Sequence, residues 1–351
     1  MKHILFILFL SFCGSLSGQV VLSADGPGDT YALIRSVLAP GENPIEVPDC
    51  NHEAFGDHID ELFDADLNKN VFRFFIHVDP DNDRCINFDR QRNEIKSYGP
   101  SPDNLLGIEN EIVVYKWKFK LPEGFQSSSS FTHLHQLKSV GGSLASIPIY
   151  TLTTRKSNPD RIELRYAETN SQVSLTTAPL EPFIGSWLEV EETISYSTNG
   201  EYDIKITRIS DGEVLLSHSE SSIINWRPGG QFVRPKWGIY RSLNNEQDLR
   251  DEEVLFADFS IEELGSVSTK NVLDESNISF SNLVDNTLYI DNIPSGITSI
   301  QLFSITGNKV LDAKIQSSGA FTHDVSALPS GIYVVNFFGV EGSFAKQIIV
   351  Q

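Results

Sequence analysis

The chain has little basic charge, few cysteines and no long apolar run. Its 351 residues contain 27 lysines and arginines against 47 aspartates and glutamates, so the formal net charge is −20. Binding to nucleic acid needs a net basic face for the phosphates, and this charge balance excludes it. Hydrophobic residues make up 40% of the chain and charged residues 21%, which is typical of a globular protein.

The only sizeable apolar run stands at the start of the chain and is too short to span a bilayer. Lys2 precedes this run, Ile4–Leu10, and small residues dominate Gly14–Gly18. This order of a positively charged residue, a short apolar stretch and small residues around a cleavage site is typical of a secretory signal peptide. We therefore predict a signal peptide over residues 1–18. We therefore expect an exported, monomeric protein that begins at Gln19 and has no transmembrane segment.

Loss of the signal peptide would leave Cys50 and Cys85 as the only thiols. In an oxidising compartment two cysteines most simply form one disulfide, with a catalytic cysteine as the alternative. On the chain-entropy model a closed loop of roughly 35 residues stabilises the fold by about 3–4 kcal/mol.

The last part of the chain differs in composition from the rest. Residues 265–351 contain no Arg and no Trp, whereas the preceding residues contain 13 Arg and all four Trp. Residues 265–275 are polar and predict a linker. Residues 276–351 predict a small all-β sandwich, because short alternating runs are separated by turn signals. These runs are Thr287–Ile290, Ser299–Ser304, Lys309–Ile315, Ile332–Phe337 and Ala345–Val350.

Two motifs in this segment resemble a known family. Leu328-Pro-Ser-Gly-Ile-Tyr-Val-Val335 and the terminal Lys346-Gln-Ile-Ile-Val350 are similar to the C-terminal sorting domain of type IX secretion. The resemblance implies that the type IX secretion machinery is a partner and that the protein reaches the cell surface or the medium. A carbohydrate-binding sandwich is the alternative, although no aromatic platform is evident.

Residues 19–264 predict a larger all-β domain. Alternating strands with polar turns favour an antiparallel β-sandwich of the jelly-roll type. Only Asp57–Phe63 is predicted to be helical. The expected strands are Val71–Val78, Glu111–Lys120, Phe131–Lys138, Ile147–Arg155, Arg161–Ala167, Trp187–Tyr196, Glu201–Ile209, Lys236–Arg241 and Val254–Ile261.

Three segments place ionisable side chains at alternate positions, where residues i and i+2 share one face of a strand. The first carries Arg90, Arg92, Glu94 and Lys96, the second His133 and His135, and the third Lys236 and Tyr240 with Trp237 and Ile239 opposite. If these faces converge, cations, imidazoles and a phenol line one site.

Such a set suits β-elimination on a uronic acid. Removal of the proton at C5 places negative charge beside a carboxylate, so a cation or strong donor must stabilise that charge. A base then takes the proton, and an acid protonates O4 as the glycosidic bond breaks. Histidine and tyrosine can serve in these roles.

The same residues carry a second resemblance. Arg92-Asn-Glu-Ile95, His133-Leu-His135 and Lys236-Trp-Gly-Ile-Tyr240 are similar to three sheet motifs of jelly-roll polysaccharide lyases that act on alginate, heparin and glucuronan. The overall likeness is greatest to the ulvan lyases of polysaccharide lyase family 28. An anionic, uronate-containing and sulfated algal polymer is therefore the expected substrate.

The resemblance also implies a role for each residue. Arg92 would hold the uronate carboxylate, His135 would act as base or neutraliser, and Tyr240 would act as acid or as both acid and base. Lys236 would lie near the same subsite. His133 stands where alginate lyases have glutamine, and it can donate a hydrogen bond to the carboxylate.

No cofactor is expected to be required, and no metal ligand set is assigned. Asp79, Asp81 and Asp83 resemble part of a structural calcium loop, but they lack its glycine and its distant glutamate, which favours a solvated acidic turn. His52 and His58 flank acidic residues and could bind zinc, but their spacing fits no strong zinc template.

Two other functions remain open. A glycoside hydrolase on the same fold needs paired acids, for which Glu189-Val-Glu-Glu192 is the nearest candidate. The other is a non-catalytic glycan-binding protein.

Overall fold

The chain divides into two units, Met1–Ser266 and Val267–Gln351. The computed structural model describes residues 19–266, 278–280, 283–293, 297–304, 309–315, 319–339 and 342–351. The predicted signal peptide lies outside the described residues, as does the predicted linker apart from its first two positions. Those two positions belong to the last strand of the first unit, which extends to Ser266.

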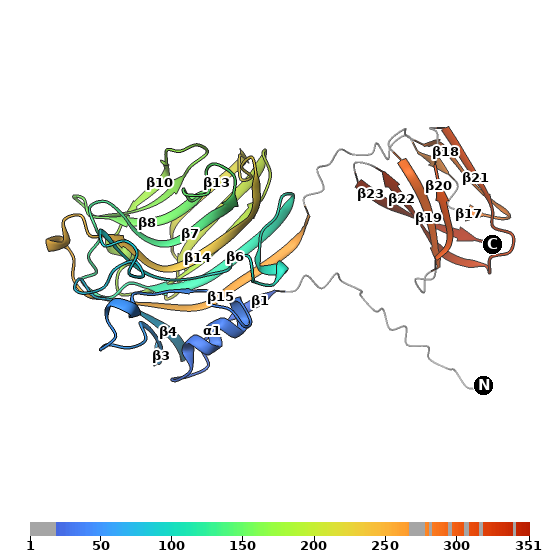
Figure 1. The fold of residues 1–351 in the computed structure, drawn as a ribbon. Helices are drawn as coiled ribbons and strands as arrows, with labels where there is room; N and C mark the ends of the chain where they lie inside the picture. The colour runs from blue at the N-terminus through green and yellow to red at the C-terminus, as the bar shows by residue number, and fades with distance from the viewer. Residues whose placement is uncertain are drawn as a thin grey trace. The chain divides into compact units, whose positions relative to one another are not determined.

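Two antiparallel sheets form the first unit, which confirms the predicted all-β sandwich (Figure 1). The eight-stranded sheet has the order β13-β12-β11-β6-β15-β4-β3, with β1 added beside β15. Its strands are β1 (Val20–Leu22), β3 (Ile59–Asp64), β4 (Lys69–Ile76), β6 (Glu111–Lys120), β11 (Trp187–Ser195), β12 (Gly200–Arg208), β13 (Val214–Ile223) and β15 (Glu252–Ser266).

The seven-stranded sheet has the order β10-β9-β8-β7-β14-β5-β2. Its strands are β2 (Ile45–Glu46), β5 (Arg90–Lys96), β7 (Thr132–Gly141), β8 (Tyr150–Arg155), β9 (Arg161–Tyr166), β10 (Val173–Pro179) and β14 (Gly230–Ser242). Strand β14 is central, between β7 and β5, which brings all three predicted polar segments into adjacent strands.

The core lies between the two sheets and takes alternate residues from their strands. Trp117 of β6 and Trp237 of β14 are both fully buried, with ring centroids 6.2 Å apart. Ile239 is also fully buried, as its position opposite Tyr240 predicts. Since alternate side chains of β14 enter the core, those between them point to the other face of the seven-stranded sheet.

The helical prediction for Asp57–Phe63 is wrong. This segment forms strand β3 and pairs with β4, from Ile59 opposite Phe74 to Asp64 opposite Lys69. The pairing supplies backbone hydrogen bonds and buries Ile59, so tertiary contacts override the local pattern.

The one α-helix of the described residues is α1 (Thr30–Leu38), which the sequence analysis missed. Thr30, Ile34 and Leu38 are its buried residues, and their spacing of four was the available signal. The remaining helical elements are the 3₁₀ turns η1 (Asp49–Asn51), η2 (Asp103–Leu105), η3 (Glu181–Phe183) and η4 (Glu246–Asp248). Within the described residues, no helix is both long and apolar enough to cross a membrane.

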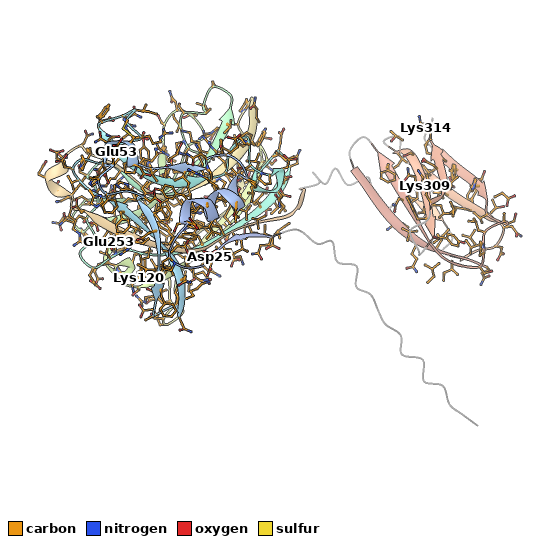
Figure 2. The ribbon with its side chains drawn as sticks, turned by 60° about the horizontal axis from the view of Figure 1, so that its bottom comes forward. Asp25, Glu53, Lys120, Glu253, Lys309 and Lys314 are labelled. Carbon is orange, nitrogen blue, oxygen red and sulfur yellow. A yellow bond between two sulfur atoms is a disulfide. The ribbon has the colours of Figure 1, made fainter. Side chains whose placement is uncertain are left out.

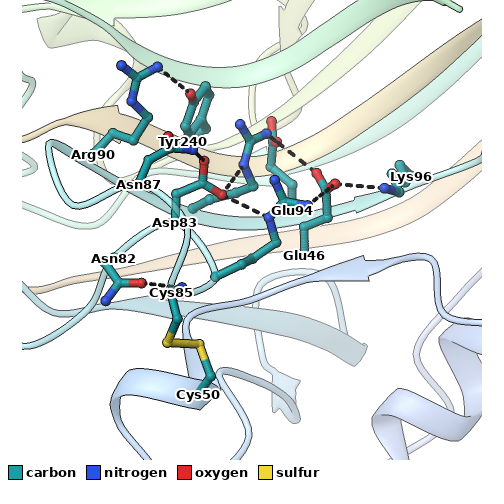
Figure 3. A network of polar contacts seen from close by, with 12 residues as sticks. Glu46, Cys50, Asn82, Asp83, Cys85, Asn87, Arg90, Glu94, Lys96 and Tyr240 are labelled. Atoms are coloured by element: carbon teal, nitrogen blue, oxygen red, sulfur yellow. Dashed lines mark hydrogen bonds and ion pairs between the residues drawn. A yellow bond between two sulfur atoms is a disulfide. The ribbon is translucent and has the colours of Figure 1, made fainter.

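Cys50 and Cys85 form a disulfide, which confirms the predicted pairing. The bond joins η1 to the loop that precedes β5 (Figure 3). It therefore fastens the N-terminal part of the first unit to one end of the seven-stranded sheet.

The second unit has its own core and its own two sheets. One has the order β16-β18-β21 and the other β17-β23-β22-β19-β20, where only β17 and β23 run parallel. The first and last residues of β20, Lys309 and Lys314, are labelled in Figure 2. The strands are β16 (Ser279–Phe280), β17 (Leu283–Val284), β18 (Thr287–Ile293), β19 (Ile297–Ser304), β20 (Lys309–Lys314), β21 (Gly319–Asp324), β22 (Gly331–Gly339) and β23 (Gly342–Val350).

Candidate functional site

Ionisable side chains gather on the face of the seven-stranded sheet that points away from the core. Directly opposed residues of antiparallel strands share a face. Tyr240 lies opposite both Arg92 and His133, and Lys236 lies opposite both Lys96 and Gln136. The same pairing, followed across the neighbouring strands, gives the other residues of this face, which we call the polar face. Its residues are Arg90, Arg92, Glu94, Lys96, His133, Gln136, Lys138, Thr151, Thr153, Arg155, Arg161, Glu163, Arg165, Arg234, Lys236 and Tyr240.

Tyr240 stands between two arginines on this face. Arg90 donates a hydrogen bond from Nη1 to the Tyr240 hydroxyl at 3.1 Å (Figure 3). The guanidinium carbon of Arg92 lies 3.6 Å from the centroid of the Tyr240 ring. His133 and Phe131 complete the surroundings, with ring centroids 5.8 and 5.1 Å from that of Tyr240. Cations on both sides favour negative charge on the phenol oxygen during a reaction.

Arg92 is anchored by carboxylates. Its Nε donates to Asp83 at 2.9 Å, and its Nη1 donates to Glu94 and, at 3.4 Å, to Glu46. Burial disfavours the charge of Arg92, but Glu94, Glu46 and Asp83 together hold its pKa above the ordinary value. The guanidinium therefore keeps its charge and its position below Tyr240.

Lys236 shares two of these carboxylates. Its Nζ donates to Glu46 and, at 3.3 Å, to Glu94, and Lys96 also donates to Glu46 at 2.7 Å. Burial opposes ionisation of Glu46, yet Lys236, Arg92 and Lys96 hold its pKa far below the ordinary value. Arg92 and Lys236 thus belong to one buried ion network, and internal carboxylates already offset their charges.

His133 differs from these cations because it is neutral. Burial lowers the pKa of His133 to about 3, and the nearby arginines Arg155, Arg92 and Arg165 act in the same direction. Its Nδ1 is buried and has no hydrogen-bond partner among the described residues. A buried polar atom without a partner costs free energy, so the polar groups beside Tyr240 are not all satisfied within the protein.

His135 does not share the face of His133, which corrects the expectation from the alternating pattern. It lies opposite Trp237 and Leu152, both core residues, and 1% of its surface is exposed. Its ring lies 4.3 Å from that of Trp117, and its Nε2 lies 2.9 Å from a carboxylate oxygen of the buried Glu192.

The physical reason is an irregularity in both pairings of β7. His133 and His135 are two residues apart on β7. Their partners on β8 are adjacent residues, whereas their partners on β14 are three residues apart. The extra residue, Leu134, is fully buried in the core, so Leu134 and His135 both point inward. Such a bulge reverses the facing of every residue beyond it.

Gly238 permits the matching irregularity in β14. Its φ of +142° lies outside the range that side chains favour, and an added Cβ would stand 2.1 Å from the carbonyl oxygen of Asn93. A glycine inside a strand pattern was the sequence signal for this bulge.

The sequence analysis missed two cations of the polar face, Lys138 and Arg234. They lie opposite each other on β7 and β14, next to Lys236. Burial lowers the pKa of Lys138 to about 8, with repulsion from Lys236, Arg92 and Arg234 adding to the effect. Unlike Arg92 and Lys236, neither forms an ion pair among the described residues, and Nε of Arg234 is buried without a partner. Their alternation with Gln136 and Lys236 was the signal that could have revealed them.

The predicted solvated acidic turn at Asp79, Asp81 and Asp83 is wrong for the last two, which are buried, and these two carboxylates do not converge as a calcium loop would require. Asp81 contacts His52 and His58, whereas Asp83 forms ion pairs with arginines, including Arg92. Asp83 instead belongs to the ion network of the polar face.

Comparison with known families identifies the second unit. Residues 271–351 match the family of secretion system C-terminal sorting domains, which confirms the predicted sorting domain. This tail marks the protein for type IX secretion, to the cell surface or beyond it. The chain has no significant sequence match among curated proteins.

Similar solved structures include polysaccharide lyases. An endo-β-1,4-glucuronan lyase from the fungus Trichoderma reesei shares 14% identity with a TM-score of 0.43, over 69% of this chain and 94% of that one. A family 14 alginate lyase from Aplysia kurodai shares 12% identity with a TM-score of 0.49, over 70% of this chain and 99% of that one. These similarities concern the fold alone.

Proposed function

We propose that the first unit is a polysaccharide lyase that cleaves a uronate-containing polymer by β-elimination. The observation that carries the proposal is the setting of Tyr240, between Arg90 and Arg92 and beside the neutral His133. A phenol held by two cations is suited to exchange a proton with substrate, and a neutral imidazole beside it can donate a hydrogen bond to the uronate.

In the proposed reaction, Tyr240 transfers the proton. Its ionised oxygen takes the proton from C5, and the electron pair of that bond forms the double bond between C4 and C5. The bond from C4 to O4 breaks, and the leaving O4 receives a proton from the Tyr240 hydroxyl. Arg90 and Arg92 stabilise the ionised phenol, and the neutral imidazole of His133 donates a hydrogen bond to the substrate carboxylate, where charge accumulates.

This assignment changes the roles that the sequence resemblance suggests. His135 is enclosed in the core beside Trp117 and Trp237, so it supports the sheet and does not contact substrate. Arg92 and Lys236 act on Tyr240 and on the local charge from within the ion network. His133 becomes the neutral donor to the uronate carboxylate.

We further propose that the substrate is sulfated, as in ulvan. Lys138 and Arg234 lie on the same face as Tyr240 and form no ion pair with any residue that the structure describes. At 3.2–3.4 Å per residue, Arg234 lies about 20 Å along β14 from Tyr240, a span that reaches neighbouring sugar units of a bound polymer. A sulfate or a second carboxylate would neutralise this pair.

The hydrolase alternative is less well supported. Glu189 and Glu191 lie on the solvent face of the eight-stranded sheet, where they pair with Lys118 and Lys116. Glu192 is buried against His135 and Tyr202. The acids of this segment therefore do not face one common site, which a glycosidase requires.

The test is ultraviolet absorbance of the full-length protein incubated with ulvan, alginate, glucuronan and heparin. Elimination creates a double bond conjugated to the carboxylate, and this product absorbs, whereas hydrolysis creates none. A rise with ulvan alone supports the whole proposal. A rise only with alginate or glucuronan, which carry no sulfate, keeps the reaction but rejects the sulfated substrate, and a rise only with heparin keeps a sulfated substrate but rejects ulvan. New reducing ends without absorbance would indicate a hydrolase.

Tyr240→Phe tests the assignment of the catalytic residue. Loss of the hydroxyl should lower turnover by about 10²–10⁴-fold, the usual contribution of a general acid–base group, while polymer binding persists. Tyr289→Phe, on an exposed side chain of the second unit, is the matched control. Full turnover in Tyr240→Phe would reject the mechanism, and binding without any elimination in the unaltered protein would indicate a glycan-binding protein.

A further inference from the structure

A cluster of three histidines and one aspartate lies outside the polar face. His52 follows η1, His58 precedes β3, His77 follows β4 and Asp81 lies in the loop after it. One ligand atom from each of these four residues lies within 4.8 Å of every other. The antiparallel pairing of β3 with β4 brings His58 beside His77, since Phe75 donates its backbone N–H to the carbonyl of His58 at 3.0 Å.

The spacing of these atoms matches a metal coordination shell. A histidine nitrogen lies 2.9 Å (His52 Nδ1), 3.2 Å (His58 Nε2) and 3.1 Å (His77 Nδ1) from an oxygen of Asp81. Ligands about 2.0–2.1 Å from a tetrahedral zinc ion are separated by about 3.3–3.4 Å. Small movements of the four side chains would therefore accommodate one ion.

The hydrogen bonds of His58 give an independent argument. Its Nδ1 lies 2.7 Å from Asp49 and its Nε2 lies 3.2 Å from Asp81, and without an ion these two carboxylates raise the pKa of His58 to about 9, despite burial, so that both nitrogens donate. A metal ion would displace the proton of Nε2 and leave the bond to Asp49 in place. Donation from Nδ1 to Asp49 leaves the lone pair of Nε2 directed at the cluster. This is the usual arrangement of a metal-bound histidine, in which a carboxylate orients the ring from behind.

Burial and access also fit a bound ion. The side chains of His58 and Asp81 are fully buried, whereas those of His52 and His77 are 21% and 17% exposed. The Phe55 ring covers the cluster, with its centroid 5.2, 4.7 and 4.4 Å from those of His52, His58 and His77. The two partly exposed rings give an ion a route into the site.

We propose that His52, His58, His77 and Asp81 bind one Zn²⁺ ion. Three imidazoles and one carboxylate suit zinc, whereas calcium takes oxygen ligands only. Because the protein supplies all four ligands, the ion has a structural role and leaves no open position for chemistry.

The site would stabilise the loop between β4 and β5. The Cys50–Cys85 disulfide joins the same two segments, and the amide of Gln91 donates to the carbonyls of Val78 at 2.9 Å and Asp81 at 3.0 Å. This loop carries Asp83, which anchors Arg92 (Figure 3). Zinc would thus help to hold one wall of the polar face in place, independently of which polymer binds there.

Metal content and spectroscopy of the full-length protein test the proposal. Protein produced with zinc present should contain about one Zn²⁺ per chain, as measured by elemental (inductively coupled plasma) mass spectrometry. After removal of metal by a chelator, Co²⁺ should give the intense visible absorption of a tetrahedral site, and Zn²⁺ should abolish it and raise the melting temperature. Absence of bound zinc together with no cobalt spectrum would overturn the proposal.

Variants separate this site from adventitious binding. His77→Ala and His52→Ala, at the two partly exposed ligands, should abolish the cobalt spectrum, and Asp49→Asn should weaken zinc binding by about 10–100-fold. His218→Ala, at a histidine of β13 whose only ion pair among the described residues is with Glu220, is the matched control. Unchanged metal binding in His77→Ala and His52→Ala would place the ion elsewhere and refute the assignment.

Discussion

Replacement of His135 and of His133 by alanine should have opposite consequences, since the two side chains lie on opposite faces of one strand. His135→Ala should destabilise the first unit, and His133→Ala should chiefly impair catalysis. A regular strand would place both histidines in one site, so this comparison tests the bulge at Leu134 directly.

The cost of His135→Ala follows from its contacts. The ring packs against Trp117 and Trp237, and its Nε2 meets the carboxylate of Glu192, which is fully buried. A buried hydrogen bond to a charged group contributes about 1.5–3 kcal/mol, and removal of a large buried side chain costs about 2–5 kcal/mol. The two effects overlap at one residue, so we expect a loss of about 3–5 kcal/mol in the free energy of unfolding.

His133→Ala should cost less, about 1–2 kcal/mol, because no hydrogen bond of its Nδ1 is lost. Thermal and denaturant unfolding of both variants provide the measurement. A change of 1 kcal/mol moves the melting temperature of a domain of this size by about 2–4 °C, so His135→Ala should melt about 6–20 °C below the unaltered first unit. A His135→Ala protein with unchanged stability but no elimination activity would refute the inward placement of His135.

Two further predictions concern charge. Lys138→Ala and Arg234→Ala should each weaken polymer binding, most strongly at low salt, because surface charges are screened by added ions. Binding assays at several salt concentrations measure this effect, and Lys116→Ala, on the far sheet, should leave affinity unchanged. Asp258, held by Lys118, has its pKa lowered to about 2, despite burial, from the usual 3.8. Its stabilisation of about 2 kcal/mol should be complete above pH 4 and lost as the pH falls towards 2, so Asp258→Asn should lower stability at pH 6 but not at pH 2.

Much of the fold was predictable because strand patterns are local. Nine strands of the first unit were located from alternation alone, and the inward positions of Trp237 and Ile239 followed from the same period of two. The disulfide followed from a count of two cysteines in an exported chain. The sorting domain followed from its terminal motifs, which family similarity confirms over residues 271–351.

Most exceptions depend on contacts between distant segments, whereas α1 was missed although its spacing of four is a local signal. β3 was mistaken for a helix because its pairing with β4 is not visible in its own residues. The pairing of Lys138 with Arg234 joins two strands nearly one hundred residues apart, so neither residue stood out by itself.

The sequence by itself determined the compartment, the two-domain composition, the sandwich architecture and the presence of Tyr240, Arg92 and Lys236 on one face. Only the tertiary structure decided which histidine joins them, because one extra residue in β7 turns His135 into the core and leaves His133 beside Tyr240. The structure alone also assembled the histidine and aspartate cluster from three separated segments. Alternation within a strand is a local property of the chain, whereas the register between strands and the meeting of loops depend on the packing of the whole domain.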